Sequence, residues 1–216
     1  MSPPDPASKA RLRRALLAAR RARTGEQRRA DAAALAAGLP AVVEGMPDPI
    51  CLFVPVGGEP GATPDGALPV LDAARALGRR VLLPVTVGDA PLDWAEFSGA
   101  ESLGPGPHGL LEPVGPRLGP GAVAGAGLVV VPALAVDHRG VRLGRGGGHY
   151  DRTLPLAGPR TRLVALVGDD GLVAEPLPAE PHDVGVHAAW RPATGLTPLP
   201  VRDAHRRVRA VRPEQP

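Results

Sequence analysis

Cysteine is nearly absent from this chain of 216 residues, which contains only Cys51. A single cysteine cannot form an internal disulfide, so the sequence excludes a disulfide-stapled secreted domain and fits a reducing compartment. Cys51 lies within an apolar run, which favours a buried, inert thiol over a catalytic nucleophile.

Aromatic residues are also scarce, at 2% of the chain, so the core must be built from Val, Leu and Ala. Nucleic-acid surfaces stack bases on aromatic side chains, and so few aromatic residues argue against such a partner. The net charge is only +3. The high pI, near 9.9, still leaves nucleic-acid binding open as an alternative, which predicts steeply salt-dependent association.

Long apolar runs are missing as well. No segment approaches the roughly 18 residues that a membrane-spanning helix requires. The Ala-rich N-terminal region is interrupted by Arg, Asp and Glu, unlike a secretory signal. We therefore expect a soluble cytoplasmic protein that has no membrane partner and is a monomer.

The chain length and the 44% apolar content predict one α/β domain over residues 8–197, between a disordered segment 1–7 and a flexible basic tail 198–216. Thr24 and Gln27 form a capping-box pattern that opens the second helix. Helices are expected over 8–23, 24–40, 65–77 and 147–154, and strands over 50–54, 81–83, 92–97, 128–131, 162–167 and 184–189.

Apolar strands alternating with helices predict a three-layer α/β/α fold with a mostly parallel sheet and the N-terminal helices packed beside it. In such sheets ligands bind beyond the carboxyl ends of the strands. Two polar loops that follow strands, 54–63 and 137–151, are therefore the candidate walls of one site.

A glycine- and arginine-rich segment, RLGRGGGHYDR at residues 142–152, is the most informative motif. Glycines allow backbone amides to converge on an anion, and Arg142 and Arg145 add donor forks suited to phosphate. Asp151 supplies a hard oxygen ligand for Mg²⁺. The motif is neither a Walker loop nor a dinucleotide fingerprint. It predicts a polyphosphate with bound magnesium; the alternative is a simple turn in a chain with 28 glycines.

The longer segment VPALAVDHRGVRLGRGGGHYDR resembles the signature of the 5-formyltetrahydrofolate cyclo-ligases, also called methenyltetrahydrofolate synthetases. Four further segments fit the same family in order: SKARLRR, VPVGGEPG, GLLEP with Glu112, and LPAEPHD with His182 and Asp183. The resemblance covers about residues 8–190, and the glycine loop is its most specific part.

The resemblance implies an enzyme that uses Mg-ATP to convert 5-formyltetrahydrofolate into 5,10-methenyltetrahydrofolate, ADP and phosphate. It implies catalytic roles for Arg145 and Tyr150, and metal binding by Asp151 and Asp183. The family's ATP contacts fall on Lys9, Arg13, Arg142, Leu143, Gly144, Arg145, Gly146, Gly147, Gly148, His149 and Tyr150. Its folate contacts fall on Val54, Glu59, Arg145, Gly146, Gly147, Gly148 and His149.

Each residue also has a plain structural interpretation. Lys9, the only lysine of the chain, lies four residues before Arg13 and shares its helix face, which suits a phosphate chain but also fits a solvated surface. Glu59 could bind pterin nitrogens or be an ordinary loop acid. Tyr150 could stack on a ring or pack against its helix.

Two features depart from the family. His149 stands where members commonly have Tyr, which changes the hydrogen-bonding edge and could alter affinity or the pH profile. The segment after Asp183 also lacks the family's threonine-bearing strand. A non-catalytic nucleotide- or folate-binding relative of the same fold therefore remains the alternative function.

Overall fold

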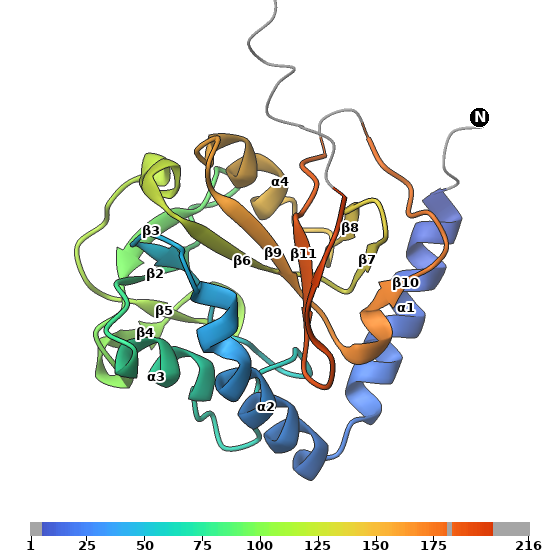
Figure 1. Cartoon of the computed structure of the whole chain (residues 1–216), viewed down its shortest axis with the longest axis horizontal. Helices are drawn as coiled ribbons and strands as arrows, with labels where there is room; N and C mark the ends of the chain where they lie inside the picture. The colour runs from blue at the N-terminus through green and yellow to red at the C-terminus, as the bar shows by residue number, and fades with distance from the viewer. Residues whose placement is uncertain (1–5, 181–182, 201–216) are drawn as a thin grey trace, which may run out of the picture.

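Seven strands form the central sheet of the computed structural model, which describes residues 6–180 and 183–200 (Figure 1). Their order is β12-β11-β9-β6-β1-β2-β3. The parallel strands are β1 (Ile50–Cys51), β2 (Val81–Val85), β6 (Leu128–Pro132), β9 (Arg162–Leu166) and β11 (Ala188–Arg191). The antiparallel strands β3 (Asp93–Glu96) and β12 (Gly195–Pro198) close the two edges. The mostly parallel sheet predicted from the sequence is confirmed.

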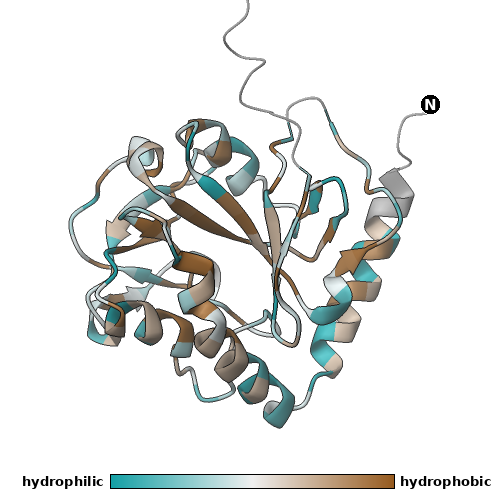
Figure 2. Ribbon diagram, viewed as in Figure 1, coloured by the Kyte–Doolittle hydropathy of each residue, from teal (hydrophilic) through white to brown (hydrophobic). Residues whose placement is uncertain are grey.

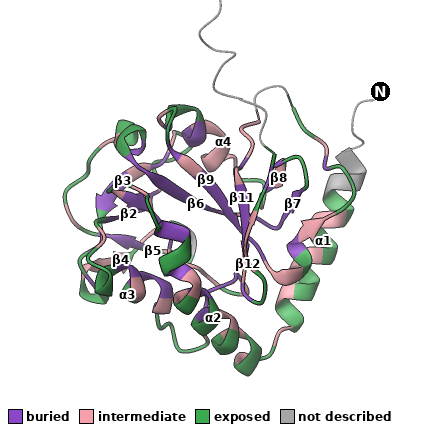
Figure 3. Ribbon diagram, viewed as in Figure 1, coloured by how far each residue is buried: buried purple, intermediate pink, exposed green. Residues whose placement is uncertain are grey.

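Helices cover both faces of this sheet, because successive strand residues point to opposite sides. Leu128 and Val130 pack in the cluster that includes α2 (Gly25–Val43) and α3 (Pro69–Ala76). Val129 and Val131 pack on the other face, with the 3-10 helices η3 (Pro120–Gly125) and η4 (Leu154–Leu156). The inner strands are accordingly apolar in Figure 2 and buried in Figure 3. The three layers are the predicted ones, although the second helical layer is built from short turns.

The first helix, α1 (Pro6–Ala22), packs against a small second sheet rather than the central one. This sheet consists of β7 (Ala135–Asp137), β8 (Arg142–Leu143) and β10 (Leu172–Val173). Leu12 and Leu16 of α1 contact its apolar cluster, which contains Leu143. The helix begins at Pro6, two residues earlier than predicted. Of the predicted disordered segment 1–7 and flexible tail 198–216, residues 1–5 and 201–216 lie outside the described residues. The prediction was wrong at the inner ends, because residues 6 and 7 belong to α1, Pro198 belongs to β12 and Leu199 is buried.

The second helix confirms its predicted start and corrects its predicted end. The Thr24 hydroxyl accepts a hydrogen bond from the Gln27 amide (3.2 Å), and Gln27 Oε1 accepts one from the Thr24 amide (2.9 Å). We expected the helix to stop by Pro40, but it continues to Val43. Burial of Val42 and Val43 against the sheet side offsets the roughly 3 kcal/mol that an interior proline costs.

The third helix starts at Pro69 rather than at residue 65. Proline is favoured at the first helical position and pushes the preceding residue out of the helical region, so Leu68 remains outside. The helix closes as predicted at Gly78, whose amide donates to the Arg75 carbonyl at 2.8 Å. The glycine-motif helix, α4 (His149–Thr153), is shorter than the predicted 147–154.

The remaining elements are short. The first strand spans only Ile50–Cys51 of the predicted 50–54, and the last predicted strand, 184–189, is displaced to Ala188–Arg191. A hairpin that we did not predict, β4 (Leu103–Pro105) with β5 (Leu111–Pro113), lies beside β2. The other 3-10 turns are η1 (Ala100–Ser102), η2 (Pro107–Gly109) and η5 (Asp169–Gly171). Within the described ranges, no helix is both long enough and apolar enough to cross a membrane.

Candidate active site

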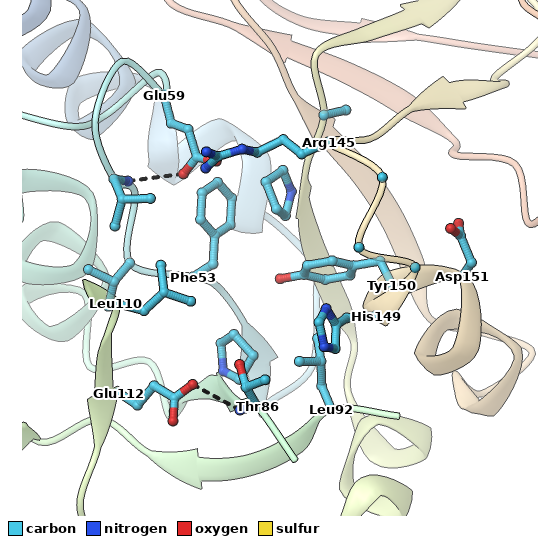
Figure 4. Close-up of a pocket in the computed structure, with 18 of the residues that line it drawn as sticks. Phe53, Glu59, Thr86, Leu92, Leu110, Glu112, Arg145, His149, Tyr150 and Asp151 are labelled. Carbon is cyan, nitrogen blue, oxygen red and sulfur yellow. Dashed lines mark hydrogen bonds and ion pairs between the residues drawn. The ribbon is translucent and has the colours of Figure 1, made fainter. Parts of the chain in front are cut away.

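A pocket of about 230 Å³ opens at the carboxyl edge of the central sheet. Phe53, Thr86 and Ala133, which follow β1, β2 and β6, line its inner end. The β4–β5 hairpin forms one side, and the glycine loop, residues 144–148, forms another (Figure 4). The two predicted wall loops therefore meet, because parallel strands place their carboxyl ends at the same edge.

Two positions of the glycine loop have a backbone conformation that requires glycine. Gly146 has φ +108° and Gly148 has φ +71°, which side chains with a Cβ rarely adopt. Gly148 also sits so close to Arg152 that a Cβ would lie 2.5 Å from its Nη1. The loop can therefore turn tightly into α4 with its backbone exposed at the pocket.

Three arginines approach this loop in different ways. Arg142 is 7% exposed and pairs with the Asp151 carboxylate. Arg145 is 60% exposed, and its Nη1 lies 3.5 Å from Oε1 of Glu59. Arg13 of α1 donates from Nε to the Gly144 carbonyl at 3.1 Å. Only Arg145 thus reaches across the pocket, from the glycine loop to the loop that follows β1.

Glu59 is a buried carboxylate of the pocket wall, only 8% exposed. Its Oε2 accepts a hydrogen bond from the Val56 amide at 3.0 Å. Burial raises the pKa of Glu59, and the Val56 amide, Arg145 and Arg20 oppose this rise. The Val56 contact fixes one oxygen, while the other faces Arg145.

Tyr150 directs its hydroxyl into the cavity from the first turn of α4 (Figure 4). The hydroxyl is buried and has no hydrogen-bond partner among the described residues. Burial raises the pKa of Tyr150, and the Glu59 charge raises it further. A buried phenol without a partner is costly, which favours a ligand that completes its hydrogen bonding.

His149 lies at the pocket wall beside Tyr150. Its Nε2 is 3.1 Å from the carbonyl oxygen of Gly88, in the loop between β2 and β3. His149 therefore ties α4 to this loop.

The two carboxylates predicted to bind metal are placed differently. Asp151 lines the pocket and is 42% exposed beside Arg142. Asp183 does not line the pocket; its Oδ2 accepts a hydrogen bond from the Glu180 amide at 2.8 Å. Its neighbour His182 lies outside the described residues.

The pocket brings together most of the residues predicted from the sequence, with five exceptions, of which Asp183 is one. Leu143 is buried under α1, and Gly144 accepts the hydrogen bond from Arg13. Arg13 itself contacts the loop from behind, and the side chain of Lys9 lies outside the described part of α1. The predicted residues that do line the pocket are Val54, Glu59, Arg142, Arg145, Gly146, Gly147, Gly148, His149, Tyr150 and Asp151.

Sequence reasoning missed several wall residues. Arg20 lines the pocket from α1, and its spacing of seven residues from Arg13 could have shown that both share a helix face. Glu112, noted only as part of GLLEP, is buried, and its Oε1 accepts a hydrogen bond from the Thr86 amide at 2.9 Å. Phe53, Leu92 and Leu110 are apolar wall residues without a local signal, because only the tertiary fold separates a pocket wall from the core.

A sequence model of the 5-formyltetrahydrofolate cyclo-ligase family matches residues 5–192 of this chain. The chain belongs to this family. It is 42% identical over 201 residues to the 5-formyltetrahydrofolate cyclo-ligase of Mycolicibacterium smegmatis, an alignment that covers 90% of this chain and 99% of the relative.

Solved structures of cyclo-ligase relatives share the fold. The NMR structure of 5,10-methenyltetrahydrofolate synthetase from Aquifex aeolicus superposes with a TM-score of 0.67 at 25% identity, covering 96% of both chains. The 5,10-methenyltetrahydrofolate synthetase of Mycoplasma pneumoniae gives a TM-score of 0.63 at 16% identity, covering 84% of this chain and 96% of the other. The family resemblance, the α/β fold and the ligase function predicted from the sequence are confirmed; the roles of single residues stay predictions.

Proposed function

We propose that this pocket carries out the ATP-dependent cyclisation of 5-formyltetrahydrofolate to 5,10-methenyltetrahydrofolate, with release of ADP and phosphate. The observation that supports it best is the 3.5 Å approach of Arg145 to Glu59 in a member of the cyclo-ligase family. This contact joins a loop suited to phosphate to a carboxylate suited to a pterin, so both substrates would react in one cavity.

The triphosphate would occupy the glycine loop. Bare backbone amides and the guanidinium groups of Arg142 and Arg145 complement its charge. Arg13 contributes by holding the Gly144 carbonyl, which steadies the loop from the α1 side. Lys9, one helical turn before Arg13, would add a further cation for the phosphate chain.

Magnesium would accompany the nucleotide, with Asp151 as its main protein ligand. Nucleotide-bound Mg²⁺ keeps phosphate oxygens and waters as ligands and needs only one or two carboxylates. The pocket position and partial exposure of Asp151 fit this, and no cluster of three or more His, Cys, Asp or Glu occurs among the described residues to form an all-protein site. The ion would neutralise charge on the phosphoryl oxygens. Asp183 remains a predicted second ligand.

The folate would lie between Glu59 and the glycine loop. The carboxylate of Glu59 can accept hydrogen bonds from pterin N–H groups, and burial strengthens such bonds. Val54 and Phe53 supply apolar surface beside it. The apolar wall formed by Leu92 and Leu110 suits the remainder of the reduced ring system.

The reaction then needs positioning and charge stabilisation more than covalent help from the protein. The formyl oxygen on N5 attacks the terminal phosphorus of ATP, and ADP leaves. N10 attacks the formyl carbon and loses its proton, and the carbon–oxygen bond breaks to release phosphate. Arg145 would stabilise the transferring phosphoryl group, and the Tyr150 hydroxyl would donate a hydrogen bond to an oxygen of the reacting centre.

The test uses purified full-length protein with Mg²⁺, ATP and 5-formyltetrahydrofolate. We expect the absorbance of the methenyl product to rise and phosphate to appear in equal amount, with neither change when ATP is omitted. Binding of both substrates without turnover would overturn the proposal in favour of a non-catalytic binder. Absence of binding, by titration calorimetry, would remove the pocket from both functions.

A further inference from the structure

Helix α1 is seated directly on the turn that carries Glu59. The contact depends on Gly58, because a Cβ there would lie 2.9 Å from the carbonyl oxygen of Arg20. Real Cβ atoms do not approach a backbone oxygen so closely, so a side chain would force the helix away. Gly58 of the VPVGGEPG segment therefore allows the backbone of Arg20 to pack against the turn that carries Glu59.

Arg20 uses this position to extend from α1 to the pocket. Its Nη2 donates to the carbonyl of Ala133, at the end of β6. It lines both the pocket and a small polar crevice of about 40 Å³ on the other side of Glu59. Burial lowers the pKa of Arg20, and the charges of Glu59 and Asp170 oppose that effect. The guanidinium is thus held by a backbone acceptor, and Arg20 lines the same two cavities as the buried carboxylate of Glu59.

The charged groups around Glu59 come from several elements. Arg145 approaches from the glycine loop and Arg20 from α1, and both favour the ionised carboxylate. Tyr150 faces it from α4, and the charge of Glu59 raises the pKa of the Tyr150 hydroxyl. The crevice behind Glu59 adds Arg23, Arg28, Asp31 and Asp170. Of these, Arg23 pairs with Asp31, and Arg28 donates to the Gly57 carbonyl at 3.2 Å.

The two arginines nearest Glu59 differ in freedom. Arg145 is 60% exposed on a glycine loop and, under the proposed function, turns to the transferring phosphoryl group. Arg20 is half-buried and fixed at Ala133, so it stays in place. Without Arg20, Glu59 would lose its counter-charge whenever Arg145 turned to the phosphoryl group. A buried carboxylate without a counter-charge tends to take up a proton, and a protonated Glu59 would bind pterin N–H groups less well.

We propose that Arg20 is a positioning residue that keeps Glu59 ionised and oriented toward the folate while Arg145 serves the triphosphate. This inference rests on the proposed function. It assigns to α1 a role in folate binding, beyond the phosphate contacts predicted for Lys9 and Arg13.

The experiment compares Arg20→Gln, Arg20→Lys and the exposed neighbour Arg21→Gln as a matched control. Both Gln and Lys keep a donor for the Ala133 carbonyl, and only Lys keeps the charge. We measure KM for each substrate, and kcat/KM for 5-formyltetrahydrofolate as a function of pH. Thermal unfolding checks that each variant is folded.

For Arg20→Gln we expect the KM for 5-formyltetrahydrofolate to rise roughly tenfold while that for ATP changes little. The acid limb of the pH profile should move up by about one pH unit, because Glu59 loses a counter-charge. Arg20→Lys should restore most of both properties, and Arg21→Gln should match the wild type.

Equal effects on both substrates, an unmoved acid limb, or no recovery with Lys would overturn the role of Arg20. If Arg20→Gln does not fold, Arg20→Lys decides alone: near-wild-type folate KM and pH profile support the proposal, and a tenfold loss contradicts it. Failure of the proposed function itself would appear separately, as a wild-type protein that forms no methenyl product.

Discussion

Among single residues, two of the three arginines of the RLGRGGGHYDR motif each pair with a carboxylate. Arg142 in β8 pairs with Asp151 in α4, and Arg145 approaches Glu59 across the pocket. A triphosphate carries more charge than either carboxylate and can accept bidentate hydrogen bonds, so it would compete for both guanidinium groups. Under the proposed function, we therefore expect ligand binding at this site to exchange these ion pairs and to leave each carboxylate free for another partner.

Substitution of Asp151 tests the expected exchange of ion pairs. Asp151→Asn should lower turnover by roughly tenfold to hundredfold and raise the Mg²⁺ concentration needed for half-maximal activity, because the amide is a weaker ligand for a hard cation. The measurement is initial rate against Mg²⁺ concentration at saturating ATP and folate.

Asp183→Asn is the informative comparison, since this carboxylate holds the Glu180 amide and does not line the pocket. A matching shift in magnesium dependence would place Asp183 at the metal. No shift would leave Asp183 with a structural role only, as the acceptor of the Glu180 amide. An unchanged magnesium dependence in Asp151→Asn would remove that residue from the metal site.

Among the helices, α2 shows most clearly what a local signal can and cannot predict: its beginning was predicted well and its end was not. The capping box of Thr24 and Gln27 is a contact between residues three apart, so the sequence alone specifies it. The end of α2 is decided by what lies beyond Pro40: Val42 and Val43 gain burial that no local pattern reveals. Pro40 remains inside the helix although it is locally unfavourable there, because the packing of the residues after it compensates.

Relief of this conflict should stabilise the protein. Pro40 is exposed, so Pro40→Ala should restore the helical hydrogen bond to the Ala36 carbonyl without disturbing the core. We expect the free energy of unfolding to rise by about 1–3 kcal/mol, measured by urea denaturation, with catalytic constants unchanged. Thr24→Ala in the same helix is the opposite control and should cost about 1 kcal/mol. A destabilised Pro40→Ala protein would show that the proline fits its site.

At the scale of the whole molecule, the site is assembled from segments far apart in the chain. Residues of α1, the loop after β1, the end of β2, the β4–β5 hairpin and the glycine loop meet at one edge of the sheet. The strand order puts β6, β1 and β2 side by side, and the parallel direction brings their carboxyl ends together. The assembly places Glu59 in a buried position that costs stability and that, under the proposed function, serves binding.

The pH dependence of unfolding should reveal this cost. The pKa of Glu59 is raised in the folded protein, so the native state binds the proton more tightly than the unfolded chain. The contribution of Glu59 to stability is therefore fully present below its unfolded pKa, near 4.5, and is lost as the pH rises through the folded value. Glu59→Gln should consequently be more stable than the wild type at pH 7, and the difference should shrink toward pH 4.

Denaturant unfolding of both proteins across this pH range measures the difference. A Glu59→Gln protein that is less stable at pH 7 would show that the arginines outweigh burial at this carboxylate. Folate binding should weaken in the variant in either case, since the amide offers only one acceptor oxygen to pterin N–H groups.

The fold class and the family could be predicted from the sequence, as could the presence of a glycine- and arginine-rich loop at the pocket. These depend on strand–helix alternation and on a contiguous motif, both of which are local along the chain. The three-dimensional structure was needed to show that Arg20, Glu59, Glu112 and Phe53 line one cavity and that Asp183 stands apart from it. These residues come from distant segments, so their distances are set by strand order and helix packing rather than by neighbours in the sequence.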